Sequence, residues 1–394
     1  MKRVANIVFL SCFLAALIAV PVCTLFSEKV GTSYYENRAL ASLPTVSVKT
    51  MSDGTFFSDL ETYFSDHIAW RDPIMKLKTW SDLNLFHRPV VGDTVVNSDV
   101  LLYFHGYQRK SLDSLDAQAA EMGDKLQKIN DQVTDYGGYF CYFGLTNHFT
   151  YFSDHYPSYI DNRLWQTEST VEAFSNALAE RDVPFLNMTP IYDAQGRPPE
   201  YYSATDHHYT YKGMLTAYDA LMKRINSDTA LHLRIFTPDD LTLTTLPNPF
   251  LGSRERKLYN LWPSDEHITI GTLKEEIPFT RTDNGAEVPA TFYALPATQE
   301  EPLPYGVYMG GDIGETIIRT NRSELPKALI FGDSFTNAME TVFWASFDET
   351  RYLDLRHYTD KALSDYLADY RPDVVICLRD DNSYLSAVGN GAIS

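Results

Sequence analysis

A strand-to-helix turn that ends in a serine is the first place in this sequence where the residue types suggest chemistry. Gly332-Asp333-Ser334 follows the apolar run 328–331 and precedes a segment with apolar residues at helical spacing. A serine at such a turn is exposed at the carboxyl edge of a parallel sheet, where α/β proteins bind ligands. Its own backbone N–H and those of the first helical turn are expected to be unpaired donors, available to a developing oxyanion. The alternative interpretation is that Asp333 and Ser334 only cap the helix, because both residue types favour that position.

A second segment, Asp206-His207-His208, contains a base and a carboxylate. The helical pattern that follows predicts Thr210 as an N-cap, so Asp206 and His208 lie in a loop that enters a helix. A serine hydroxyl becomes an effective nucleophile when a neighbouring base takes its proton and a third group orients that base. Histidine suits the role of the base because its pKa is near neutral. Packing is the alternative for the two histidines.

Asp206, His207 and His208 are also residue types that bind metal ions. No second cluster of ligands accompanies them in the sequence. Structural and catalytic metal sites need three or four protein ligands in a defined geometry. We therefore expect neither a metal site nor a cofactor.

Continuously apolar strands alternate with helical patterns around these two segments. The predicted strands are 138–144, 183–187, 327–331, 351–355 and 373–378. The predicted helices are 113–134, 168–181, 211–226, 335–347 and 360–369. Apolar strands that alternate with helices indicate an α/β fold, in which a parallel sheet is covered by helices on both faces.

Two further regions precede or interrupt this pattern. Residues 27–100 contain polar loops and two helical patterns, and we interpret them as a leader region before the main domain at 101–394. The segment at about 228–325 is rich in Pro, Thr and Gly and predicts an irregular or β-containing insertion.

The amino terminus has the pattern of a signal or anchor. Lys2 and Arg3 precede an apolar run that extends to about Phe26, so residues 1–26 are long enough for a membrane-spanning helix of about 20 residues. The basic start places the amino terminus in the cytoplasm and the rest of the chain outside it. No small-residue cleavage motif follows the run, and an uncleaved anchor is preferred over a cleaved signal.

Composition limits the partners of the chain. The 33 basic residues against 52 acidic ones give a net charge of −19, which disfavours nucleic acid as a partner. Cys141 and Cys377 each lie in a predicted strand, and we interpret them as buried, packed residues. Their spacing leaves a disulfide between them open.

Several short motifs, in this order, resemble the DHHW family of secreted proteins, which is related to the SGNH-type alginate O-acetyltransferases. They cover most of the chain after the apolar run. The motifs are Glu36-Asn37-Arg38-Ala39-Leu40, Tyr63-Phe64-Ser65-Asp66-His67 with Arg71-Asp72, Asp206-His207-His208-Tyr209, Phe250-Leu251-Gly252-Ser253-Arg254, Gly332-Asp333-Ser334-Phe335 and Leu353-Asp354-Leu355-Arg356-His357-Tyr358. Tyr209 stands where the family has tryptophan, and the resemblance implies that it keeps an aromatic wall near the substrate. The resemblance implies an SGNH hydrolase-like, flavodoxin-like sheet.

The resemblance also implies roles for the residues of the two segments. In the relatives the pattern Asp-x-His supplies orienter and base and a later serine is the nucleophile, which implies Asp206, His208 and Ser334 here. His207 then becomes a neighbour in contact with the substrate or the base. Tyr384 resembles a tyrosine near the substrate in the relatives.

Three weaker candidates follow predicted strands. Asn147 follows strand 138–144 and is either an oxyanion donor or a turn residue. Arg379 and Arg356 lie just beyond strand ends, where they contact a sugar or an acyl oxygen, or form surface ion pairs. Ion pairing is the preferred interpretation for both arginines.

The resemblance implies an extracytoplasmic O-acetyltransferase that acts on a cell-surface or secreted polysaccharide, with acetyl groups delivered by an integral membrane O-acyltransferase. Ordinary SGNH esterases place Asp and His after the serine, whereas both precede it here, which favours the acetyltransferase branch. Two alternatives stay open. One is a carbohydrate esterase that uses the same triad with water as acceptor. The other is a polysaccharide-binding or assembly protein without turnover.

Overall fold

The structure is a computed structural model that describes residues 2–36, 38–108 and 111–386. Its chain divides into two compact units. The first consists of Met1–Thr94 and Ser253–Pro263, and the second of Val95–Gly252 and Ser264–Ser394. Asn37 of the first motif lies outside the described residues.

The first unit is mainly helical. Its helices are α1 (Lys2–Phe26), α2 (Val48–Ser52), α3 (Thr55–His67), α4 (Arg71–Asn84) and α10 (Ser253–Lys257), and its short strands include β1 (Thr32–Ser33) and β2 (Arg38–Ala39). Within α1, the segment Arg3–Phe26 is long and apolar enough to cross a membrane by length and composition. A helix of this kind serves either as a membrane anchor or as a signal sequence.

The motif residues of the first unit form an ion-pair network. Arg38 donates to both carboxylate oxygens of Asp66, with N–O distances of 2.5 and 2.9 Å, and Asp66 also accepts from the N–H of Ala41 at 2.9 Å. Arg71 donates to Glu36 at 2.7 Å. The hydrogen bond from Arg38 holds the pKa of Asp66 well below its usual range. These motif residues therefore join β2 to α3 and stabilise the unit.

Within the described residues, eight strands of the second unit form one sheet in the order β11-β10-β12-β14-β13-β15-β6-β7. Five of them correspond to the predicted strands: β6 (Tyr139–Leu145), β7 (Phe185–Asn187), β13 (Ala328–Gly332), β14 (Glu349–Asp354) and β15 (Val374–Asp380). All neighbouring pairs among these five are parallel. The prediction of one parallel sheet is confirmed.

The order of the five parallel strands is a permuted flavodoxin-like order. Across the sheet the strands lie in the order β14-β13-β15-β6-β7. If β13, β14, β15, β6 and β7 are numbered 1 to 5, this order is 2-1-3-4-5, which is the flavodoxin-like order. If the five strands are instead numbered as they occur in the chain, the order read from β7 to β14 is 2-1-5-3-4. The flavodoxin-like expectation therefore holds for the sheet and not for the chain order. This permutation explains why Asp206 and His208 precede Ser334 in sequence.

The insertion contributes strands that the sequence patterns did not predict. β10 (Thr280–Asp283), β11 (Ala286–Val288) and β12 (Glu315–Arg319) extend the sheet beyond β14 by antiparallel pairing. β8 (Leu241–Pro249) and β9 (His267–Leu273) form a separate antiparallel hairpin. Short strands β3 (Val90–Val91), β4 (Thr94–Val96) and β5 (Leu101–Tyr103) precede the main sheet in the chain.

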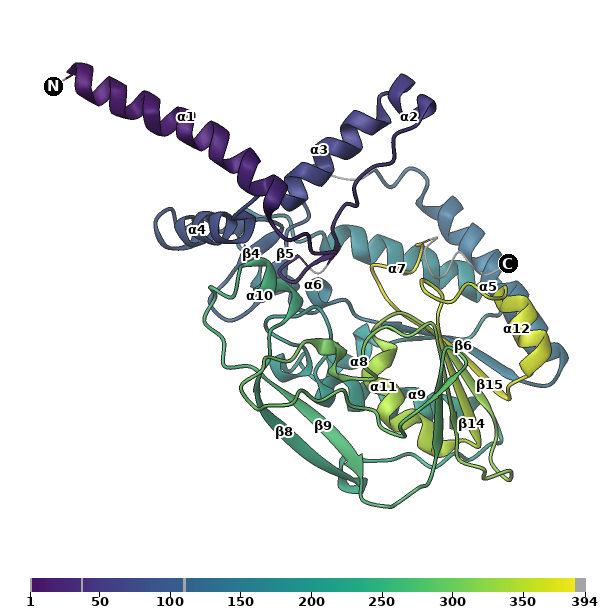
Figure 1. The fold of residues 1–394 in the computed structure, drawn as a ribbon. Coiled ribbons are helices and arrows are strands. Elements are labelled where there is room, and N and C mark those ends of the chain that lie inside the picture. The colour runs from purple at the N-terminus through teal and green to yellow at the C-terminus, as the bar shows by residue number, and fades with distance from the viewer. Residues whose placement is uncertain (1, 37, 109–110, 387–394) are drawn as a thin grey trace. The chain divides into compact units, whose positions relative to one another are not determined.

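Helices cover both faces of the parallel part of the sheet, as expected (Figure 1). α5 (Leu115–Asp135), α7 (Leu164–Ala179) and α12 (Leu363–Tyr370) pack on one face, where their apolar residues join a buried cluster with the strands. α9 (Tyr211–Asp228) and α11 (Thr336–Phe343) lie on the other face and contact each other. The short helices α6 (His148–Tyr151) and α8 (Thr189–Ala194) follow strands β6 and β7.

The two strand cysteines lie in the core of this sheet. Cys141 of β6 and Cys377 of β15 are fully buried in adjacent strands. Burial raises the pKa of the Cys141 thiol to about 12. This placement agrees with the interpretation of both residues as packed side chains.

Candidate active site

Ser334, His208 and Asp206 meet at the carboxyl end of β13. The Ser334 Oγ lies 2.7 Å from Nε2 of His208, across 126 positions of sequence. Nδ1 of the same ring lies 2.5 Å from Oδ1 of Asp206. With its proton on Nδ1, the imidazole donates to the carboxylate and presents the lone pair of Nε2 to the serine hydroxyl. This is the geometry in which a histidine can accept a proton from serine.

The turn that carries Ser334 is held from the neighbouring strand β15. Gly332 has no side chain at a point where a Cβ would lie 2.2 Å from the carbonyl oxygen of Leu378, so only glycine allows the two strands to approach. Asp333 accepts from Arg379 at 3.0 Å, and both side chains are buried. Burial alone would lower the pKa of Arg379, but the charge of Asp333 raises it. The ion pair therefore fixes the residue before the serine.

Asp333 closes the turn that precedes α11, whereas the N-cap residue of the helix is Phe335. Oδ1 of Asp333 accepts from the N–H of Phe335 at 3.0 Å. The N–H of Thr336 donates to the carbonyl of Asp333, and that of Asn337 to the carbonyl of Ser334. The expectation of free N–H groups in the first helical turn is therefore wrong for these three residues, because the turn closes on itself.

The loop that carries Asp206 is held by Glu266, the residue that precedes β9. Ser203 Oγ accepts from the N–H of Asp206 at 2.8 Å and donates to Glu266 at 3.0 Å. Glu266 also accepts from the N–H of Ala204 at 3.1 Å and from Thr205 Oγ1 at 2.7 Å. Burial raises the pKa of the Glu266 carboxyl above its ordinary value. A residue of the insertion thus positions the backbone of the orienter.

A glycine of the Phe250–Arg254 motif packs against the same loop. A Cβ at Gly252 would lie 2.3 Å from the backbone of Thr205. A side chain there would displace the residue that precedes Asp206. The motif therefore has a structural role at the site.

The residues after His208 join the segments that carry His208 and Ser334. The hydroxyl of Tyr209, which is fully buried, donates to the carbonyl of Phe335. Thr210 caps α9 as predicted, and its Oγ1 accepts from the N–H of Gly213 at 3.2 Å. Tyr209 thus ties the base segment to the turn after Ser334 and does not form an open aromatic wall.

Tyr305, which the sequence patterns did not single out, stacks on the base. Its ring lies parallel to the imidazole of His208, with centroids 3.7 Å apart and an interplanar angle of 4°. Tyr305 lies in the insertion and is 8% exposed. Burial raises the pKa of its hydroxyl well above the ordinary value. No local motif marks this tyrosine, because the contact with His208 is formed only by the fold.

Exposure differs among the three central side chains. His208 and Asp206 are 4% and 2% exposed, whereas Ser334 is partly exposed. A solute can therefore reach the serine while the base and carboxylate stay shielded from water. Electrostatic interactions among groups shielded in this way are stronger than in water.

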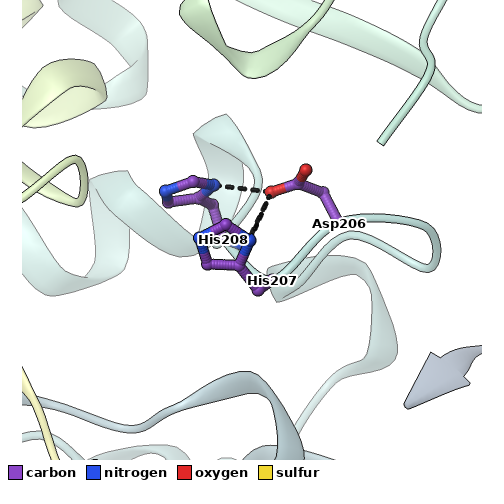
Figure 2. Close-up of side chains that lie close together, drawn as sticks. All are labelled: Asp206, His207 and His208. Carbon is purple, nitrogen blue, oxygen red and sulfur yellow. Dashed lines mark hydrogen bonds and ion pairs between the residues drawn. The ribbon is translucent and has the colours of Figure 1, made fainter. Parts of the chain in front are cut away.

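Asp206, His207 and His208 form a compact group (Figure 2). One oxygen of Asp206 faces both rings, 2.5 Å from Nδ1 of His208 and 3.5 Å from Nδ1 of His207. The side chain of His207 is 40% exposed. Both ring nitrogens of His208 face protein partners, so a metal ion on either nitrogen would interrupt the hydrogen bond to Asp206 or to Ser334. A second group of potential ligands consists of Asp312, Asp354 and His357.

The four other sequence candidates lie in different surroundings. The amide of Asn147 donates to Asp380 at 2.6 Å, and its Oδ1 accepts from the N–H of Phe149 as an N-cap of α6. Tyr384 is fully buried in the hydrophobic core cluster. Arg379 forms the buried ion pair with Asp333, and not a surface pair as preferred from the sequence.

Arg356 is partly exposed and is held by two carboxylates. Its Nη2 lies 2.5 Å or less from Asp354 and 3.1 Å from Asp312. The preferred interpretation of an ion pair describes this arginine well. Its position follows the end of β14, which pairs with β13 at Gly332.

Two buried carboxyl groups, Asp380 and Asp381, directly follow Arg379 in the sequence. Burial raises the pKa of Asp380 to about 6 and that of Asp381 well above its ordinary value. Asp381 accepts from Thr150 at 3.2 Å. Asp380 is the last residue of β15, Asp381 follows it, and both side chains are buried.

A cavity of about 780 Å³ lies next to the residues that surround His208. Its lining includes Tyr209, Tyr305 and Glu266, but not Ser334 or His208. It is therefore a neighbour of the triad, separate from the position of the serine hydroxyl.

No protein-family model and no curated protein matches the chain. Solved structures do match it. PatB1 of Bacillus cereus has a TM-score of 0.64 at 21% identity, over 74% of this chain and 96% of PatB1. A PatB1 structure with a sulfonyl adduct has a TM-score of 0.63 at 19% identity, over 75% and 97% of the two chains.

A DHHW family protein from Eubacterium siraeum matches with a TM-score of 0.56 at 18% identity. The match covers 77% of this chain and 98% of that protein. At these identities the similarity concerns the fold. The chain therefore shares its fold with PatB1 and with a DHHW family protein, which confirms the structural relation that the motifs imply.

Proposed function

We propose that this chain is an extracytoplasmic O-acetyltransferase that transfers acetyl groups to a polysaccharide through an acyl-Ser334 intermediate. The observation that carries the proposal is the chain of contacts from Ser334 Oγ to His208 at 2.7 Å and from His208 to Asp206 at 2.5 Å. Such a chain activates a serine for acyl transfer. The fold shared with a DHHW family protein supports it at the level of architecture.

In the first step, Ser334 Oγ attacks the carbonyl carbon of an acetyl ester and His208 Nε2 takes the serine proton. Asp206 stabilises the imidazolium that forms. The oxyanion is assigned to the backbone N–H of Ser334, because the N–H groups of the next three residues are used within the turn. Collapse of the intermediate releases the donor alcohol, which takes the proton from His208.

In the second step, a sugar hydroxyl attacks the acetyl-Ser334 ester. His208 takes the proton of that hydroxyl and returns it to Ser334 Oγ as the acetylated sugar leaves. Water in place of the sugar would make the same site an esterase. The acetyl donor is expected to come from an integral membrane O-acyltransferase, and α1 would anchor the chain in the same membrane with the triad outside the cytoplasm.

The test is direct acylation of the protein by an activated acetyl ester, followed by mass spectrometry of the intact chain and of its peptides. Wild-type protein should acquire an acetyl group on the peptide that contains Ser334, and Ser334→Ala should not. Ser98→Ala, which changes an exposed serine of the same unit, is the matched control and should label like the wild type. Labelling of Ser334→Ala at the wild-type rate would refute the covalent mechanism.

Acceptors are then added to the acetylated protein. Transfer to oligosaccharides faster than loss to water supports the transferase, whereas loss at a rate independent of oligosaccharide supports the esterase. Sulfonyl fluorides, which react with activated serines, offer a second label with the same variants.

A further inference from the structure

Helices α3 and α4 of the first unit present large apolar side chains outward. Phe64 of α3, Ile74, Leu77 and Trp80 of α4, and the flanking residues Trp70 and Phe86 are each between 42% and 65% exposed. We call these six residues the apolar face. Exposed apolar surface of this extent marks an interaction site.

The same helices bury polar residues instead. Asp66 of α3 and Thr79 and Asp82 of α4 are 8%, 4% and 5% exposed. Asp82 pairs with Lys78 at 2.8 Å and with Arg88 at 3.2 Å. A helix on the surface of a water-soluble protein has the opposite arrangement, with its apolar stripe toward the core. The inversion points to apolar surroundings outside the unit.

The apolar residues of α4 lie on one stripe. Ile74 and Leu77 are three residues apart, which places them on the same side of the helix, and Trp70 is the N-cap residue just before them. Trp80 lies one turn further along, next to this stripe. Trp70 and Trp80 are two of the chain's five tryptophans.

The start of α4 is attached to the last turns of α1. The buried N–H of Ala69 donates to Oγ1 of Thr24 at 2.9 Å. Figure 1 shows the carboxyl end of α1 next to the junction between α3 and α4. Arg3–Phe26 has 24 residues, and a helix of this length spans about 36 Å, slightly more than the roughly 30 Å core of a bilayer. Thr24 and its partner Ala69 therefore come to the boundary of the membrane that α1 would span.

We propose that α3 and α4 lie in the interfacial layer of the outer leaflet, with the apolar face toward the lipid acyl chains. Tryptophan side chains favour this depth, where an apolar ring and a polar N–H are both accommodated. Helices that lie in the plane of the interface bury an apolar face by about 5–10 Å. The inference goes beyond the acetyl-transfer proposal, since it concerns how the first unit contacts the membrane.

The contact of α3 and α4 with the bilayer is expected to depend on burial of apolar side chains and not on attraction between basic residues and anionic lipids. The chain carries a net charge of −19, and α4 mixes Lys76 and Lys78 with Asp72 and Asp82. Anionic lipids would therefore add little to the attraction. Bilayers of phosphatidylcholine alone should suffice, at both low and high salt.

The experiment is quenching of tryptophan fluorescence by brominated phosphatidylcholine in vesicles that contain the full-length protein. The double variant Trp70→Phe/Trp80→Phe should lose most of the quenching seen with the wild type. Trp344→Phe, which changes a buried tryptophan of the second unit, should retain it. Exposed Trp→Phe changes remove no core contact, so folding is expected to be kept.

A second variant tests the apolar face without changing the fluorophores. Ile74→Ser/Leu77→Ser should lower the quenching and raise the accessibility of tryptophan to acrylamide. Flotation of the vesicles reports separately on insertion of α1.

Flotation with quenching that is the same in wild type and in Trp70→Phe/Trp80→Phe would overturn the proposal. So would tryptophans that stay open to acrylamide in the floated protein, which would indicate that a protein and not lipid covers the face. Failure to float would overturn it as well, because α1 would then not hold the unit at a bilayer. None of these outcomes depends on the acylation of Ser334, so the two proposals can fail independently.

Discussion

The imidazole of His208 and the phenol ring of Tyr305 lie face to face, 3.7 Å between centroids and 4° from parallel. The tyrosine belongs to the insertion, whereas the histidine precedes α9. Stacking of this kind restricts rotation of the imidazole about its own bond and keeps water from one of its faces. The ring of His208 is thereby held in the plane in which Nδ1 meets Asp206 and Nε2 meets Ser334.

Tyr305→Leu should therefore slow acylation of Ser334, by about ten- to a hundred-fold, because a small displacement of a catalytic group has an effect of this size. Tyr305→Phe should retain the rate, since the stacked ring is kept. The hydroxyl of Tyr305 is buried without a hydrogen-bond partner among the described residues, so its removal should leave thermal stability equal or higher. Acylation rates at several pH values and melting temperatures of both variants check this. Equal rates for Leu and Phe would show that the ring does not position the base.

Asp206→Asn should reduce the acylation rate on the order of 10⁴-fold at neutral pH. The amide cannot stabilise the imidazolium and favours the wrong tautomer of His208, although its size is nearly unchanged. Single-turnover acylation is the measurement. His207→Gln, at the exposed neighbour, is the control and should have a much smaller effect, because Nε2 of His208 is the atom next to Ser334. A large effect of His207→Gln alone would reverse the assignment of the base.

Glu266→Gln should disturb the loop that carries Asp206. The carboxylate accepts from Ser203, Ala204 and Thr205, and an amide replaces one acceptor atom by a donor that faces N–H and O–H groups. Loss of such buried acceptors costs about 1–3 kcal/mol, and acylation should slow with it. Thermal unfolding and acylation kinetics test both effects. The exposed Glu276 on the same part of the chain provides the control variant, Glu276→Gln, which should change neither.

Stability should fall as the pH rises from about 5 to 8. Burial raises the pKa of Glu340 to about 8, although Thr336 donates to it at 2.7 Å. In the unfolded chain a glutamate titrates near 4.3, so over this range the folded state holds a proton that the unfolded state has lost. The free energy of unfolding then decreases with pH and stops decreasing above the folded pKa.

Glu340→Gln should flatten this dependence and raise the melting temperature at pH 8 relative to the wild type. The free energies of unfolding of Glu340→Gln and of the wild type should differ by a few kcal/mol at most. This difference should vanish toward pH 4. Glu287→Gln, at an exposed position, should follow the wild-type curve. A melting temperature of Glu340→Gln that parallels the wild type from pH 5 to 8 would show that Glu340 is ionised in the fold.

Much of the fold follows from local patterns in the sequence. The strands β6, β13 and β15 contain continuous apolar runs that are buried in the sheet, and shorter apolar stretches mark β7 and β14, so five of the eight strands of the sheet were predicted. The strands β10, β11 and β12 were not, because they lie at the edge of the sheet and mix polar with apolar residues. The contact between Asp206 and His208 is also local, since only His207 separates them and the loop alone can form it.

The contacts between distant segments depend on the tertiary structure. Ser334 and His208 meet at the carboxyl edge of the sheet, where the ends of the parallel strands β13 and β7 both lie. The same packing stacks Tyr305 on His208, buries Arg379 against Asp333 and encloses Tyr384 in the core. The sequence by itself determined which residues could act as nucleophile, base and orienter, because residue type and local spacing are enough for that. Their supports depended on contacts between segments far apart in the chain, for which no local pattern exists.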